Sequence, residues 1–233
     1  MNSTLYIYNK VKKTAAFALL CMLSPLASQA QSVALKTEGL EPDYVATITK
    51  RAQKIVDGMA IFDAEKALTV RNIIANRYFL LNGIHEQYDK EMKFAKDSLQ
   101  GKERDKARQQ AATKRDAELY KHHFELEGAL SLYVDADGID MVKNGMTYDV
   151  VNVTYKAYCD MIPSLKDHEK SQIMAWLKEA REFAMDAGKS NDKHGWFKKY
   201  KGRINNWLSA QGYDIQKERE AWMKRIEEKK SKK

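Results

Sequence analysis

Residues 143–163 read KNGMTYDVVNVTYKAYCDMIP, and this stretch decides how we expect the chain to fold. At about 100° per residue, apolar side chains cover two faces of a helix. Only Asp149, Lys156 and Asp160 form a charged line between those faces. A helix that is apolar nearly all round is normally enclosed by other helices. Pro163 disfavours continuing the helix, so we predict a central helix that ends there and is wrapped by its neighbours.

Three tyrosines lie on the predicted inner face of this helix, at Tyr148, Tyr155 and Tyr158. A buried phenol needs a hydrogen-bond partner for its hydroxyl. The helix is therefore either an ordinary core element with satisfied tyrosines or the floor of a polar pocket, and the pattern leaves both readings open.

The rest of the chain also shows helical periodicity, and no stretch alternates as a strand would. Further helices are expected near residues 42–58, 63–99, 111–133, 137–143, 165–188, 196–211 and from 214 onward. The two longest are joined by the charged segment 100–110, which is either a turn or a polar overhang of a helix. We predict an all-α, single-domain bundle of about six or seven helices with a long antiparallel hairpin.

Residues 1–30 have the pattern of a signal peptide. Three lysines precede an apolar run, and Ser28-Gln29-Ala30 places small residues where a signal peptidase cleaves. We expect cleavage near Ala30 and a periplasmic or secreted protein consisting of residues 31–233. No run approaches the roughly 20 apolar residues of a membrane span, so we expect no integral membrane segment.

The mature chain is basic. Cleavage lowers the net charge from +8 to +5, because 37 basic residues then face 32 acidic ones. The excess lies mainly in residues 189–203 and in the C-terminal tail 224–233. An exported protein meets little nucleic acid, so we expect no nucleic acid partner. Acidic glycans, anionic lipid head groups and acidic protein segments are the partners to weigh.

No strong catalytic motif is present. The sequence lacks a zinc-ligand pattern, a glycine-rich phosphate loop and a nucleophile elbow, so we expect no metal and no cofactor. The candidates are polar or aromatic residues on otherwise apolar faces. The predicted proton-transfer groups are His85 and Tyr155, and the predicted substrate-binding residues are Arg77, Tyr148, Lys156, Trp196, Lys199, Arg203 and Asn206.

Each group of candidates has a structural alternative. Arg77 and His85 lie on the packed side of the long helix, where an arginine must be paired, so a structural ion pair with a hydrogen-bonded histidine is the other reading. Trp196 and Arg203 share a face that would suit a sugar ring and its carboxylate. Helix packing covered by lysine stems explains that face equally well.

Three segments together resemble an uncharacterised, domain-of-unknown-function family of secreted all-helical bacterial proteins associated with polysaccharide utilisation, notably of pectic glycans. They are GMTYDVVNVTYKAY (145–158), LKDHEKSQIMAWLKEAREFAMDAG (165–188) and KHGWFKKYKGRINNWLSAQGYD (193–214). The resemblance implies a periplasmic or surface setting and a glycan context. It supplies no established catalytic residue.

Our leading hypothesis is an exported protein of a glycan-utilisation system that recognises an acidic oligosaccharide or polysaccharide. Whether it also cleaves the glycan, as a lyase or a hydrolase, is left open. The alternative is a non-enzymatic periplasmic helical scaffold or chaperone-like protein. Binding to a membrane surface through the basic C-terminal helix is a third hypothesis.

Overall fold

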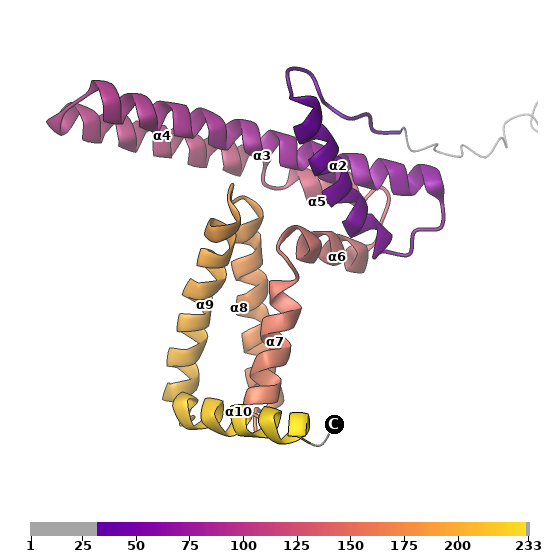
Figure 1. Ribbon diagram of the computed structural model, residues 1–233, viewed down its shortest axis with the longest axis vertical. Coiled ribbons are helices and arrows are strands. Elements are labelled where there is room, and N and C mark those ends of the chain that lie inside the picture. The colour runs from indigo at the N-terminus through magenta and orange to yellow at the C-terminus, as the bar shows by residue number, and fades with distance from the viewer. Residues whose placement is uncertain (1–31, 232–233) are drawn as a thin grey trace, which may run out of the picture. The chain divides into compact units, whose positions relative to one another are not determined.

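The computed structural model describes residues 32–231, which are helical apart from short connections (Figure 1). The helices are α2 (Pro42–Asp57), α3 (Ala64–Ser98), α4 (Gly101–His122), α5 (Glu125–Leu130), α6 (Ala136–Met146), α7 (Val150–Met161), α8 (Asp167–Met185), α9 (Ser190–Ala210) and α10 (Ile215–Ser231). Within residues 32–231 no strand occurs, so the all-α prediction is confirmed. The predicted signal peptide, residues 1–30, lies outside the described residues.

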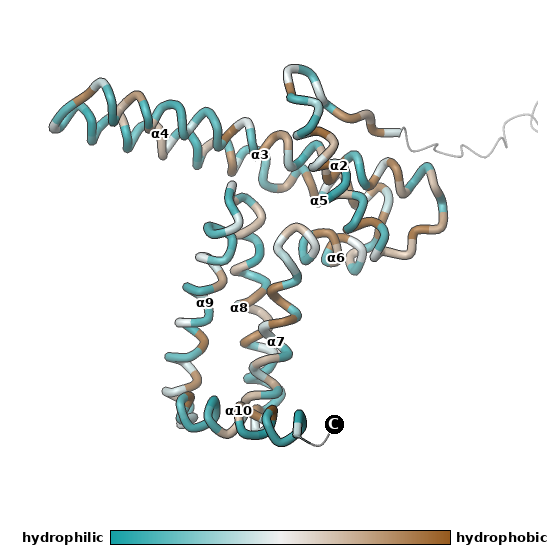
Figure 2. The backbone as a smooth tube through the Cα atoms, in the orientation of Figure 1, coloured by the Kyte–Doolittle hydropathy of each residue, from teal (hydrophilic) through white to brown (hydrophobic). Residues whose placement is uncertain are grey.

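Helices α3 and α4 lie side by side and form the predicted antiparallel hairpin (Figure 1). Asp63 begins α3 by accepting hydrogen bonds from the backbone amides of Glu65 and Lys66, at 2.9 and 3.0 Å. The chain reverses at residues 99–100, and the charged residues 101–110 continue as helix. Figure 2 shows the hydrophilic character of this part of α4. Of the two alternatives for the charged segment, the polar helix overhang is therefore correct.

The described chain has more helices than the six or seven expected, partly because the segment predicted as one helix, 111–133, is divided. Helix α4 ends at His122 and α5 begins at Glu125. The carbonyl oxygen of His122 accepts a hydrogen bond of 2.7 Å from Arg77 of α3. This tertiary contact occupies a carbonyl of the last helical turn, and local periodicity gives no sign of it.

Two apolar clusters form the core of the described chain. The first lies mainly between α2, α3, α5 and α6 and includes Val70, Ile74, Leu130, Val142 and Met146. The second lies between α7, α8 and α9 and includes Val151, Ile173, Leu177, Phe197 and Ile204. Each such side chain contributes about 1.5–3 kcal/mol when it is fully buried. The described residues 32–231 nevertheless belong to one compact unit.

The prediction of one enclosed helix over residues 143–163 is wrong. Helix α6 ends at Met146 and α7 begins at Val150, with a sharp turn between them. Helix α7 packs on α8 and α10, so it is covered only in part, and Val153 on its other side is 63% exposed. Tyr148 lies in the turn and not on the helix, and its side chain is 48% exposed. The apolar residues of this stretch are thus divided between two helices and two clusters.

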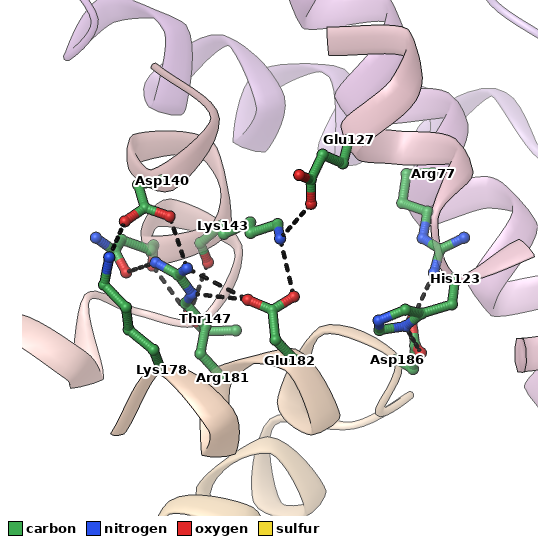
Figure 3. A network of polar contacts seen from close by, with 11 residues as sticks. Arg77, His123, Glu127, Asp140, Lys143, Thr147, Lys178, Arg181, Glu182 and Asp186 are labelled. Carbon is green, nitrogen blue, oxygen red and sulfur yellow. Dashed lines mark hydrogen bonds and ion pairs between the residues drawn. The ribbon is translucent and has the colours of Figure 1, made fainter. Parts of the chain in front are cut away.

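A polar network joins α6 to α8 (Figure 3). The Arg181 guanidinium, 2% exposed, donates to Asn144 at 2.8 Å and to Asp140 at 2.7 Å. Lys178 pairs with the other oxygen of Asp140 at 2.6 Å. Burial would raise the pKa of Asp140, but the hydrogen bonds from Lys178 and Arg181 hold it below its ordinary value. Lys143 extends the network from α6 to Glu182 of α8, at 2.9 Å.

Lys193 of α9 closes the C-terminal end of α8. Its ammonium donates to the carbonyl oxygens of Ala184 and Met185, at 3.0 and 3.5 Å, and the residue is 5% exposed. The last carbonyls of a helix have no amide partner one turn further along the helix. Lys193 supplies a partner for the Met185 carbonyl and adds one for the Ala184 carbonyl, which also accepts from the Ala187 amide at 3.3 Å. Burial outweighs the nearby carboxylate of Asp186 and lowers the pKa of Lys193 to about 8.

The low pKa of Lys193 predicts a rise in stability with pH. Between pH 8 and pH 10 the unfolded lysine keeps a proton that the folded one loses, so the free energy of unfolding should increase by about 2 kcal/mol. Urea denaturation of the wild type and of Lys193→Met at each pH measures the difference. The comparison stops at pH 10, because Tyr78, Tyr158 and Tyr200 have pKa values raised from 10 to about 12 in the folded protein. Above pH 10 these phenols ionise more readily in the unfolded chain, so the free energy of unfolding falls again. Parallel curves for the two proteins would contradict the prediction.

Candidate functional site

A cleft of about 1460 Å³ lies between α2 and the segment that joins α6 to α7, and we take it as the candidate site. One wall is α2. Arg71 and Tyr78 of α3 also line the cleft, and the other wall is formed by residues between Met141 and Asn152, from α6 to the start of α7. Pockets for drug-sized ligands are typically about 300–1,000 Å³, so this cleft has room for a ligand of several linked units.

Gly145 sets the distance between the two walls. A Cβ atom at this position would lie 2.8 Å from Cγ1 of Ile55, closer than real Cβ contacts come. Helices α2 and α6 therefore approach each other here because position 145 has no side chain. Ile55 and Gly145 both line the cleft, so this close contact belongs to its surface.

The turn after α6 has an unusual backbone. Tyr148 and Asp149 have φ values of 61° and 55°, which side-chain-bearing residues rarely adopt and which cost about 1–3 kcal/mol each. Hydrogen bonds hold the turn: the Asp149 amide donates to the Asn144 carbonyl at 2.8 Å, and Asn152 donates to the Asp149 carboxylate at 2.6 Å. Strained backbone of this kind is found often at binding sites.

This turn presents the ring of Tyr148 to the cleft. The ring stacks on His194 of α9, with 5.3 Å between centroids and an interplanar angle of 14°. Tyr148 therefore has one face against a fixed neighbour while almost half of its side chain is open to solvent. Of the sequence-predicted site residues, Tyr148 is the one that lines this cleft.

The cleft carries an excess of positive charge. Four cations line it, namely Lys50, Arg51, Lys54 and Arg71, against two carboxylates, Asp57 and Asp149. Both carboxylates accept hydrogen bonds from neighbouring amides, at 2.7 and 2.6 Å. Among the described residues, none of the four cations forms an ion pair with a carboxylate. Concave surfaces lined by charge of one sign concentrate ligands of the opposite sign.

Two of the cations contact neutral groups. The guanidinium of Arg51 lies 5.5 Å from the ring centroid of Tyr78, and that of Arg71 donates to the Asn72 side chain at 2.9 and 3.1 Å. Burial raises the pKa of Tyr78 to about 12, so its phenol stays protonated at neutral pH and can donate a hydrogen bond. The cleft thus offers fixed positive charge, a phenol and an exposed aromatic ring to a ligand.

Residues 45–228 match the sequence model of a family described as protein of unknown function (DUF3826). The chain belongs to this family. The DUF3826 match includes all of the cleft-lining residues, from Ala46 to Asn152. It confirms the predicted resemblance to an uncharacterised family, while secretion and the link to polysaccharide utilisation stay predictions. A comparison with the curated proteins gave no match.

The described residues of this DUF3826 protein contain neither a cluster of metal ligands nor a membrane-spanning helix. Over the described residues, no group of three or more His, Cys, Asp or Glu side chains gathers closely enough to hold a metal ion. The described helices also include none that is both long enough and apolar enough to cross a membrane.

Arg77 and His85 lie outside the cleft, and both contact Asp186 at the end of α8. Arg77, 5% exposed, pairs with the Asp186 carboxylate at 2.5 Å, and His123 contacts its other oxygen at 2.6 Å (Figure 3). His85 is 2.8 Å from the Asp186 carbonyl oxygen. The structure therefore matches the alternative reading of a structural ion pair with a hydrogen-bonded histidine. Gly188 allows this contact, since a Cβ there would lie 2.7 Å from the His85 ring.

Tyr155 and Lys156 lie on α7, also away from the cleft lining. Tyr155 is half-buried, and burial together with the neighbouring Cys159 raises the pKa of its phenol. Lys156 is exposed and pairs with Asp160 one turn along the same helix, at 2.7 Å. The lysine is thus part of an exposed ion pair, which contributes little to stability.

The remaining predicted residues lie on α9. Trp196 is half-buried, Lys199 and Arg203 are exposed beside it, and Asn206 is exposed farther along the helix. Positions two apart on a helix point to nearly opposite sides, so Trp196 and the cleft-side His194 lie on opposite flanks of α9. The predicted site residues are therefore divided among separate places and do not converge on one cavity.

The four cations of the cleft are not among the residues predicted from the sequence. A signal was present in residues 50–54, KRAQK, which place three cations within five positions and no acid among them. Helical periodicity assigns these three cations to the polar face of α2, where exposed charges are ordinary. Only the position of α6 across from them turns that face into the wall of a cleft.

The different settings of Arg77 and Lys156 predict different effects of substitution. Arg77→Ala should lower the free energy of unfolding by about 3–5 kcal/mol, because it leaves Asp186 partly buried without its guanidinium partner. Lys156→Ala should leave the free energy of unfolding nearly unchanged, since its ion pair is fully exposed. Urea denaturation of both variants measures the effects, and a free energy of unfolding that is nearly unchanged in Arg77→Ala would show that Arg77 is not a structural residue.

Proposed function

We propose that this DUF3826 protein is an exported glycan-binding protein that holds an acidic oligosaccharide in the cleft between α2 and the α6–α7 turn. One observation carries the proposal: four cations without carboxylate partners face the exposed ring of Tyr148 across a hollow of about 1460 Å³. Elsewhere the chain pairs its buried arginines with acids, so these cations are available to a ligand.

The chemistry of the walls suits uronate sugars. Arg51 and Arg71 can bind a carboxylate through two parallel hydrogen bonds, and Lys50 and Lys54 add point charges one helical turn apart. On the opposite wall, Tyr148 offers an aromatic face against which the apolar side of a sugar ring can lie. A ligand with negative groups along one edge and sugar faces along the other would satisfy both walls at once.

The predicted signal peptide supports an extracytoplasmic setting, where acidic polysaccharides are available as ligands. The sequence pattern of residues 1–30 supports export, and the basic charge of the mature chain supports an acidic ligand.

The proposal concerns binding, and cleavage of the bound glycan would be detected by its products. A lyase would generate unsaturated sugar ends and a hydrolase only new reducing ends, whereas a binding protein would generate neither.

Binding to galacturonate oligomers, measured by titration calorimetry, tests the proposal. Replacing Arg51 and Lys54 together by alanine should weaken binding by at least about 100-fold, because two charged hydrogen bonds of about 1.5–3 kcal/mol each are lost. Tyr148→Ala should weaken it as well. Lys156→Ala, which removes an exposed cation outside the cleft, serves as the matched control.

Two results would contradict the proposal. One is equal affinity for the same oligomer after its carboxylates are reduced to alcohols, since the cations would then have no role. The other is the absence of saturable binding to any acidic oligosaccharide.

A helical scaffold or chaperone-like protein is the second candidate. The observation that favours it is a set of exposed aromatic side chains on the hairpin and just beyond it: Phe94 is 60% exposed, Tyr120 73% and Phe124 66%. Exposed apolar patches mark interaction sites for other proteins. Suppression of client aggregation that persists in the Arg51/Lys54 double variant but is lost in Tyr120→Ser with Phe124→Ser would support this function.

A further inference from the structure

A row of aromatic rings runs between α8 and α9, on the flank of α9 away from the cleft. We call it the aromatic ladder; its members are Trp176, Phe183, Trp196, Tyr200 and Trp207. Phe183 stacks on Trp196, with 4.6 Å between centroids and 17° between planes. Trp176 meets Trp207 edge-on at 5.2 Å. Phe183 is 46% exposed and the three tryptophans are half-buried, so the ladder reaches solvent.

Two exposed cations cover the rings of the ladder. The ammonium of Lys199 lies 5.0 Å from the ring centroid of Trp196, and the guanidinium of Arg203 lies 4.5 Å from that of Trp176. The local acid is Glu179, which accepts a hydrogen bond from Tyr200 at 2.7 Å and forms a long contact of 3.4 Å with Arg203. Exposed cation–π contacts and exposed ion pairs are weak. Both cations can therefore turn toward a ligand and uncover the ring faces beneath them.

We propose that the aromatic ladder is a second binding surface for an anionic glycan chain, separate from the cleft. Carboxylates of the chain would meet Lys199 and Arg203, and the faces of its sugar rings would lie on Trp196 and Trp176. Charge complementarity selects an anionic ligand, because one carboxylate, already shared with Tyr200, balances the two cations. The inference rests on the proposed function for the identity of its ligand.

A glycan fits the ladder better than a membrane surface does. The rings lie against one another and are half-buried, whereas insertion into a bilayer needs aromatic side chains that project from the surface. A row of flat rings with cations beside it suits an extended chain. Because no residue of the ladder lines the cleft, a short oligomer can occupy one of the two surfaces, while a long chain can contact both and gain avidity.

The distribution of tryptophan permits a selective test. The sequence has four tryptophans; Trp176, Trp196 and Trp207 belong to the ladder, and Trp222 lies on α10. The residues that line the cleft include tyrosine but no tryptophan. In a Trp222→Phe background, tryptophan emission therefore reports the ladder, while calorimetry reports both sites together.

The experiment titrates this protein with galacturonate oligomers and follows tryptophan emission and its quenching by acrylamide. We expect a saturable change in emission and protection from the quencher. Lys199→Ala with Arg203→Gln should weaken the fluorescence-detected binding by at least about tenfold, because one charged hydrogen bond alone contributes about 1.5–3 kcal/mol, and Lys198→Ala should not. The Arg51/Lys54 double variant should leave the fluorescence titration unchanged and weaken the calorimetric binding of the cleft by at least about 100-fold. Circular dichroism checks that each variant is folded.

Each other outcome overturns one of the proposals. Calorimetric binding that disappears in the cleft variant, with no change in tryptophan emission of the parent, would refute the ladder site and leave the proposed function standing. No binding by either method would refute both. Association of the ladder with phosphatidylglycerol vesicles, without a response to glycan, would show that the surface binds lipid and would also refute the inference.

Discussion

The pairing of two buried arginines fixes the arrangement on which the rest of the structure depends. Arg77 and Arg181 are 5% and 2% exposed, and each lies where an element of the first apolar cluster meets α8. A buried guanidinium without a partner costs several kcal/mol, so the fold must bring Asp186 to Arg77 and Asp140 to Arg181. These contacts hold α8 against α3 and α6, and the turn into α9 follows from them.

That arrangement also shapes the cleft. With α8 held against α6 and α9 beginning close to the end of α8, His194 reaches the ring of Tyr148. The strained turn at Tyr148 and Asp149 is tolerated because neighbouring side chains and the backbone hold it on several sides. The chain satisfies the buried charges at its core and leaves the cations of α2 without carboxylate partners. This contrast between paired and unpaired cations separates structural charge from charge available to a ligand.

The aromatic ladder also combines structural side chains with cations that are only weakly held, on a different surface. Its rings join α8 to α9 and so contribute to packing, yet the cations above them are held only by weak, exposed contacts. The helix-packing reading of Trp196 and Arg203 thus describes the contacts between α8 and α9, and ligand binding by the same residues stays a proposal. If both surfaces bind the same polymer, the cleft and the ladder hold different segments of one chain.

Sequence alone determined the helical class, the α3–α4 hairpin and the termini of most helices, because periodicity, capping residues and local composition act over a few turns. The membership of an uncharacterised family came from the resemblance of three segments and from the family match. The sequence also showed that Arg77 would need a partner, but it could not name Asp186, which lies 109 positions away. The cleft was decided only by tertiary structure. The cations of residues 50–54 form an ordinary polar face until Gly145 lets α6 approach α2, and Tyr148 leaves the expected helix because the backbone turns there. Such sites arise from contacts between distant elements, and a local pattern carries no record of them.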